Sequence, residues 1–283
     1  MRRVTASRVW CGVGIWLSAL AFSAPASAYQ QTMTCYPSGP YACRAGEIAL
    51  PVSWRDRSQT YYVNAAGSPD LARDADGQVG ASVLDSLAAS FAAWTDPSCA
   101  RIEVEYAGLT ERTDIGFDRD RDDNINLVIW QDEWPYASSS AYALTSVTFS
   151  VQSGVISDAD VEFNDEYFEF TNDPEGRNIV DLRNTMTHEA GHFIGLDHSS
   201  VEDSTMYETA PEGETKKITL EQDDLSALCA IYDSEPEPLP DTTTGDSGTC
   251  AIAPQARPSH PTLPWLVIAL TGVAAALCGR RRW

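Results

Sequence analysis

The chain has 283 residues and a formal net charge of −22, an acidity that excludes a protein that binds the phosphates of nucleic acid. Both ends contain arginines but no acidic residue, so the part between them is more negative still. We therefore expect one soluble, acidic globular region between two short terminal segments of different composition.

The first segment, residues 1–28, is typical of a secretory signal peptide. Arginines precede an apolar run at 9–22, and small residues follow at 26–28. This pattern predicts cleavage before Tyr29, followed by an N-terminal extension at 29–52. A permanent N-terminal membrane anchor is the alternative, but the apolar run is short for a membrane span.

Apolar periodicity predicts a single α+β domain across residues 53–232. The expected elements are, in chain order, a strand in 53–64, a helix at 79–94, strands at 101–106, 126–131, 142–152 and 156–164, a helix at 179–196 and a helix at 220–232. Thr219 is the expected N-cap of the last helix, and Gln222 would complete a capping box. We expect a twisted sheet that covers the first two helices.

Two different segments follow the predicted domain. Residues 233–262 are rich in Pro, Asp, Thr, Ser and Gly, which predicts an extended stalk rather than a packed domain. Residues 263–283 combine an apolar run with terminal arginines, which predicts a hydrophobic membrane anchor or a sorting tail. With Cys250 upstream, this end resembles the C-terminal sorting segments of exported myxobacterial proteins. The expected location is therefore extracellular or at the cell surface.

Residues 188–198 read His-Glu-Ala-Gly-His-Phe-Ile-Gly-Leu-Asp-His, and they contain three of the four histidines of the chain. On a helix, His188 and His192 project from the same face, one turn apart. Gly195 can end that helix in a left-handed turn, which would bring His198 to the same metal ion. Three protein ligands leave one tetrahedral position for water, so the pattern predicts a catalytic zinc site.

From residue 53 to residue 232 the chain resembles the metzincin metallopeptidases, and within them the matrixin branch. The zinc motif matches that of the family at every fixed position, including Glu189 after the first histidine. Ser199, after the third histidine, is the matrixin residue, and Met206 supplies the methionine turn beneath the metal. Glu208 stands where other metzincin branches have a zinc-binding tyrosine, so no tyrosine ligand is expected.

The resemblance implies a metzincin-type catalytic domain, with a twisted, mostly parallel sheet, an antiparallel edge strand, a zinc cleft and a C-terminal helix. Residues 159–164 resemble the strand that lines the cleft in this family, to which substrate adds as an antiparallel strand. The implied activity is that of a zinc endopeptidase, in which Glu189 assists the attack of zinc-bound water on a peptide bond. The expected partners are protein or peptide substrates, and the expected state is a monomer.

A catalytically silent, zinc-containing module that binds peptides at the surface is the alternative function. A pseudo-enzyme usually lacks the general base or a metal ligand, and this chain keeps both. A zinc hydrolase with a non-peptide substrate is a third reading, which the methionine turn and the candidate substrate strand disfavour.

The cysteines agree with export to an oxidising compartment. Cys35 and Cys43 form one expected disulfide, and Cys99 and Cys229 form the other. A thiol of Cys35 that blocks the zinc is the alternative to the first pair.

An acidic stretch at residues 118–124 carries oxygen ligands at alternate positions. It lacks the central glycine and the closing glutamate of an EF-hand, so it forms either a calcium loop or a solvated acidic turn. Zinc is thus the expected cofactor, with calcium as a second candidate.

Overall fold

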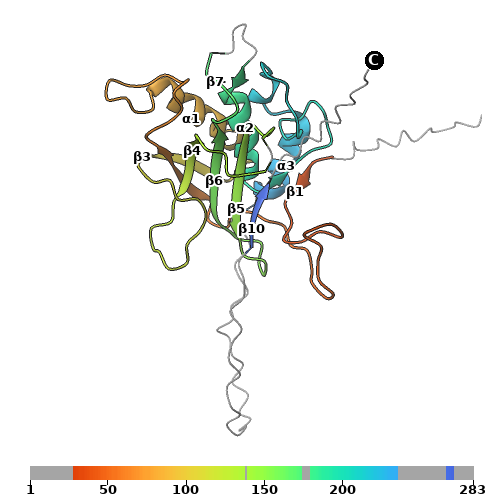
Figure 1. Cartoon of the computed structure of the whole chain (residues 1–283). Helices are drawn as coiled ribbons and strands as arrows, with labels where there is room; N and C mark the ends of the chain where they lie inside the picture. Colours follow the sequence, from red (N-terminus) through yellow and green to blue (C-terminus); the bar gives the residue numbers. More distant parts are fainter. Residues whose placement is uncertain (1–27, 138, 174–178, 235–265, 271–283) are drawn as a thin grey trace, which may run out of the picture.

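The structure is a computed structural model that describes residues 28–137, 139–173, 179–234 and 266–270. The predicted signal peptide, apart from Ala28, and most of the predicted stalk and C-terminal segment lie outside the described residues. Within those ranges the chain forms three α-helices, one short 3-10 helix and ten strands, arranged around a central mixed sheet (Figure 1).

Six strands form the central sheet, in the order β10-β5-β6-β4-β2-β3. Their bounds are Ser58–Asn64 for β2, Glu103–Thr110 for β3, Asn126–Gln131 for β4, Ala143–Phe149 for β5, Ile156–Asn164 for β6 and Leu266–Leu270 for β10. β2 pairs in parallel with β3 and β4, and β4 pairs in parallel with β6. β5 runs antiparallel to both β6 and β10. The predicted α+β class, with a mixed sheet, is therefore confirmed.

Four two-residue strands complete the described part of the fold as two small pairs. β1 (Gln30–Gln31) pairs antiparallel with β9 (Leu196–Asp197), and β7 (Phe170–Thr171) pairs in parallel with β8 (Val180–Asp181). The first pair brings the predicted N-terminal extension against the segment that follows the second helix.

Two helices lie together on one face of the central sheet (Figure 1). Helix α1 (Ala81–Thr95) buries Val83, Leu87 and Trp94, whose spacing follows the helical period. Helix α2 (Leu182–Phe193) packs against α1, β5 and β6, and nearly all of its residues are buried. Because a buried helix can hold polar side chains only where each finds a partner, the histidines and glutamate of α2 indicate a site.

Helix α3 (Gln222–Tyr232) begins later than the predicted residue 220. The prediction that Thr219 is its N-cap, with Gln222 as the capping-box partner, is wrong. Glu221 is the N-cap, and Asp224 completes the capping box. Thr219 instead has extended backbone, with φ −124° and ψ 139°, because it links a preceding 3-10 turn to the helix.

The strand predicted to line the cleft, residues 159–164, is the C-terminal part of β6. β6 is hydrogen-bonded to β4 on one side and to β5 on the other, so it has no free edge for a substrate strand. The prediction is therefore wrong. β5 and the residues that precede it lie beside the histidines, and the outer edge of β5 is paired with β10.

Both predicted disulfides, Cys35–Cys43 and Cys99–Cys229, are present. Cys35 is therefore not a free thiol that blocks a metal. The second disulfide joins the segment after α1 to helix α3. No helix in the described ranges has the length and the apolar character that a membrane span needs.

Candidate metal centre

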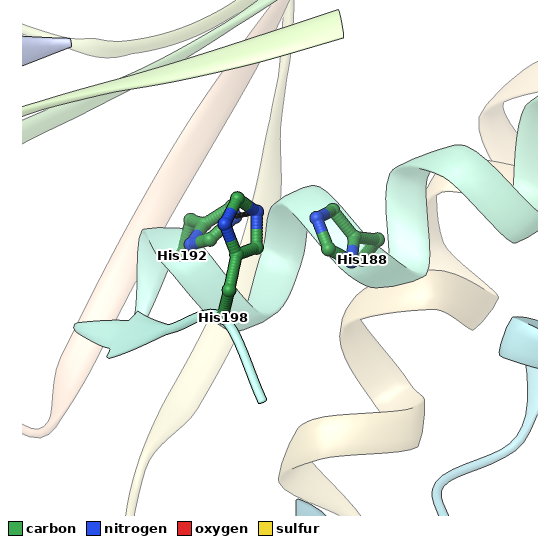
Figure 2. Close-up of side chains that lie close together, drawn as sticks. All are labelled: His188, His192 and His198. Atoms are coloured by element: carbon green, nitrogen blue, oxygen red, sulfur yellow. Dashed lines mark hydrogen bonds between the residues drawn. The ribbon is translucent and has the colours of Figure 1, made fainter. Parts of the chain in front are cut away.

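Helix α2 and the turn after it bring the three predicted histidines together (Figure 2). His188 and His192 lie one turn apart on α2, and His198 follows strand β9. One ring nitrogen from each histidine lies within 4.8 Å of the others, and the Nε2 atoms of His192 and His198 are 3.2 Å apart. Within the described residues, this is the group of three with the geometry of a metal site.

Gly195 makes the turn that returns His198 to the helix. Its φ of 94° lies in the left-handed region that favours glycine. A Cβ at this position would lie 2.4 Å from the carbonyl oxygen of Val52, so the close approach of the segment around Val52 also requires glycine. The predicted role of Gly195 is thus confirmed by its backbone.

Backbone carbonyls set the tautomers of the two helical histidines. Nδ1 of His188 lies 2.7 Å from the carbonyl oxygen of Thr205, and Nδ1 of His192 lies 2.8 Å from that of Leu196. Because a carbonyl only accepts hydrogen bonds, each Nδ1 carries the proton and each Nε2 keeps a free lone pair. Burial lowers the pKa of both rings, which keeps them neutral, as metal ligands must be. Burial also lowers the pKa of His198, so three neutral imidazoles, two of them with a free Nε2, fit a zinc ion.

Met206 lies next to α2 and is only 2% exposed. The carbonyl oxygen of Met206 accepts a hydrogen bond of 2.8 Å from the backbone N–H of Ser199, which ties the turn to the residue after His198. A carboxylate of α3 holds the turn from the other side. Asp224 accepts hydrogen bonds from the hydroxyl of Ser204 at 2.5 Å and from the backbone N–H of Thr205 at 2.8 Å.

Glu189 is buried next to the histidines, and the hydroxyl of Thr145 on β5 donates to its Oε2 at 2.7 Å. Burial raises the pKa of Glu189 to about 7, although Thr145 and Lys217 oppose that shift. A carboxyl group with such a pKa can both accept and release a proton near neutral pH.

Comparison with known proteins agrees with this geometry. A sequence model of the matrixin family matches residues 54–233. The chain belongs to the matrixin family.

Two kinds of curated relative share parts of this matrixin sequence. Metalloendoproteinase 2-MMP of Arabidopsis thaliana is 44% identical over 57 residues, which are 20% of this chain and 15% of the plant protein. Matrix metalloproteinase-18 of Xenopus laevis is 25% identical over 215 residues, which are 76% of this chain and 40% of the frog protein. The chain thus spans less than half the length of either relative. Family and relatives together support a metalloprotease that uses zinc.

The N-terminal extension of the matrixin supports the third histidine. The hydroxyl of Tyr36 donates to Oδ2 of Asp197 at 2.8 Å, and Oδ1 of Asp197 accepts from the backbone N–H of His198 at 2.8 Å. Together with the pairing of β1 and β9, these contacts fix the segment that carries His198.

The acidic stretch at 118–124 is held by arginines in this matrixin. Arg121 pairs with Asp114 at 2.5 Å and with Asp123 at 2.9 Å, and Arg112 also contacts both carboxylates. Asp123 is thus neutralised by cations of the protein itself. These contacts favour the acidic turn over the calcium loop.

Three residues of the site could not be predicted from the sequence. Thr145, Lys217 and Asp224 reach it from β5, from the 3-10 helix Lys216–Ile218 and from α3. Each is an ordinary residue in its own segment, and only the tertiary fold brings it to α2. Glu208 also lines the cavity beside the histidines.

Proposed function

We propose that this matrixin is an exported zinc endopeptidase, with His188, His192 and His198 as the metal ligands and Glu189 as the general base. The observation that carries the proposal is the convergence of three neutral imidazoles next to a buried carboxylate with an elevated pKa. Zinc bound there supplies a Lewis acid that polarises the peptide carbonyl and lowers the pKa of water.

The residues of the chain supply the proton transfers. Glu189 accepts a proton from the attacking water, and it then delivers the proton to the leaving amine. The hydroxyl of Thr145 donates to Oε2 of Glu189 and so orients the carboxylate in its ionised form. An extended peptide that takes the place of β10 on the outer edge of β5 would lie with its backbone beside this carboxylate.

Export and attachment at the cell surface form the second part of the proposal. The segment at 1–28 has the pattern of a signal peptide, and the apolar C-terminal segment has the pattern of an anchor or sorting tail, although its residues 266–270 pair with β5 as strand β10. The two disulfides support an oxidising compartment. Fractionation of cells that express the full chain tests this part, and a wholly cytoplasmic protein would contradict it.

The variant Glu189→Gln tests the catalytic assignment because it keeps the size of the side chain and removes the base. Hydrolysis of a mixed peptide library should fall by about 10²–10⁴-fold. Zinc content, measured by mass spectrometry of the purified protein, should stay at the wild-type level. A variant that hydrolyses peptides at the wild-type rate would show that Glu189 is not the base.

The same peptide library distinguishes the enzyme from the alternative function, a catalytically silent module that binds peptides. The wild-type protein loaded with zinc should hydrolyse peptides, and a chelator should abolish the activity until zinc is returned. Peptide binding without any hydrolysis would favour the silent module instead.

A further inference from the structure

A buried lysine lies in the cavity next to the three histidines. The cavity has a volume of about 210 Å³ and extends from the histidines and Glu189 to Lys217. Residues 140–142 and Ala143, the first residue of β5, line it on one side, and Asn184 of α2 lines it on another. A substrate side chain that enters this space would meet Lys217.

The direction of β5 determines which substrate residue faces the cavity. Strand β10 shows that a peptide can lie antiparallel on this edge, with Leu270 opposite Thr145. Thr145 contacts Glu189, so the reacting peptide bond lies near this position. A peptide that runs on in the same direction then passes Ala143 and the residues before it, which line the cavity. The cavity therefore receives the residue that follows the cleaved bond.

Lys217 is held in place by its backbone and has unused donors at its tip. It is only 3% exposed, and its backbone N–H donates to Oδ1 of Asn184 at 2.7 Å. The Nζ atom donates to the carbonyl oxygen of Tyr207, the one acceptor that it contacts among the described residues. An ammonium group has three N–H donors, so two are left for a side chain in the cavity.

No carboxylate in the described ranges lies within 4 Å of the Lys217 ammonium. Glu214, Glu189 and Asp224 act on the Lys217 charge from beyond that distance, and Glu214 also lies 3.8 Å from Nζ of the neighbouring Lys216. Burial lowers the pKa of Lys217 to about 8, which leaves the side chain mainly protonated at neutral pH.

A buried cation with free donors discriminates between substrate side chains. An apolar side chain in the cavity would displace water from the ammonium and leave two of its N–H donors without a hydrogen-bond partner, which is costly. A carboxylate would instead make a charge-assisted hydrogen bond, the strong kind. Glutamate reaches further into a cavity than aspartate, and it therefore suits a lysine that is only 3% exposed.

Resting on the endopeptidase function proposed above, we propose that Lys217 determines specificity by selecting a glutamate immediately after the cleaved bond. Lys217 is a binding residue for the substrate side chain and takes no part in the proton transfers.

Cleavage of a mixed peptide library by the zinc-loaded full chain tests the proposal, with every cut site sequenced. Glutamate should be enriched at the position after the cut, by about tenfold over leucine. The variant Lys217→Met should cut the library at other sites, with the preference reversed toward apolar residues. The matched control Lys216→Met changes the same charge on the same turn, and it should keep the preference for glutamate.

A peptide-binding experiment tests this proposal independently of the proposed endopeptidase activity. The same library is passed over immobilised, zinc-loaded Glu189→Gln protein with Lys217 intact or replaced by methionine, and the retained peptides are sequenced. Enrichment of glutamate that disappears with Lys217→Met supports the proposal even if the wild-type protein hydrolyses nothing. A wild-type preference for apolar residues after the cut, or a glutamate preference that survives Lys217→Met, would overturn it.

Discussion

Replacing Gly191 by alanine should destabilise the protein, although alanine is the better helix residue. In an exposed helix the change would stabilise by about 1 kcal/mol. Gly191 lies on buried α2, however, where a Cβ would meet Sδ of Met206 at 2.2 Å and Cζ2 of Trp94 at 2.8 Å. Both distances are too short for real contacts, so one or both neighbours must move.

Neither neighbour can move freely. Trp94 is fully buried, and its Nε1 donates to the carbonyl oxygen of Thr187 at 2.7 Å. Met206 is flexible, but it is packed on all sides and its backbone is tied to Asp224 and Ser199. Overpacking of this kind costs roughly 1–3 kcal/mol. With two clashes we expect the upper end, about 3 kcal/mol, so the net loss after the helix gain is about 2 kcal/mol.

Urea unfolding of Gly191→Ala, with and without zinc, measures this loss. The double variant with Met206→Ala is the matched control because it removes the closer contact. If the clash is the cause, Gly191→Ala should cost less in the Met206→Ala background, and the difference is the coupling energy. A Gly191→Ala protein as stable as the wild type, or an equal cost in both backgrounds, would refute the reasoning.

Three further predictions concern other parts of the domain. Burial raises the pKa of Asp158 and of Asp160, which are hydrogen-bonded to each other, so stability falls as the pH rises from the unfolded pKa through the higher folded values. Asp158→Asn removes one of the two acids, so in urea titrations it should gain stability relative to the wild type between pH 4 and pH 8. Deleting residues 235–283, which include β10, should raise kcat/KM for peptides, because the edge of β5 is then free; an unchanged value would contradict this. Cleavage before Tyr29 would place a new ammonium 3.2 Å from Oδ1 of Asp223. A chain that starts at Tyr29 should melt higher than one with residues retained before it, and Asp223→Asn should remove the difference.

Much of the fold could be predicted because several segments carry unambiguous local patterns. Strands β4 and β6 have the predicted bounds, since β4 is largely an apolar run and β6 alternates polar and apolar residues between polar turns. Helix ends were less predictable. The segment before α3 offers several residues that can cap a helix, and Asp224 decides among them because it also binds the turn at Met206.

Strand order could not be predicted from the same patterns. β5 and β6 are both buried along almost their whole length, so their residues give no sign of which strand lies nearer the edge. The side chains of the site also fall into two groups, those that the sequence could predict and those that it could not. The histidines are close in the sequence and their spacing predicted the cluster, whereas Thr145 and Lys217 depend on how distant segments pack.

The metal centre depends on helix α3 although no residue of α3 is a predicted ligand. Asp224 is buried, and its carboxylate is compensated by donors from the methionine turn and from its own capping box. The carbonyl oxygen of Thr205, in that turn, sets the tautomer of His188. Because Cys99–Cys229 joins α3 to the segment after α1, movement of α3 is restrained at both of its ends. The disulfide, the carboxylate and the turn therefore form one support that holds the first histidine ready for the metal.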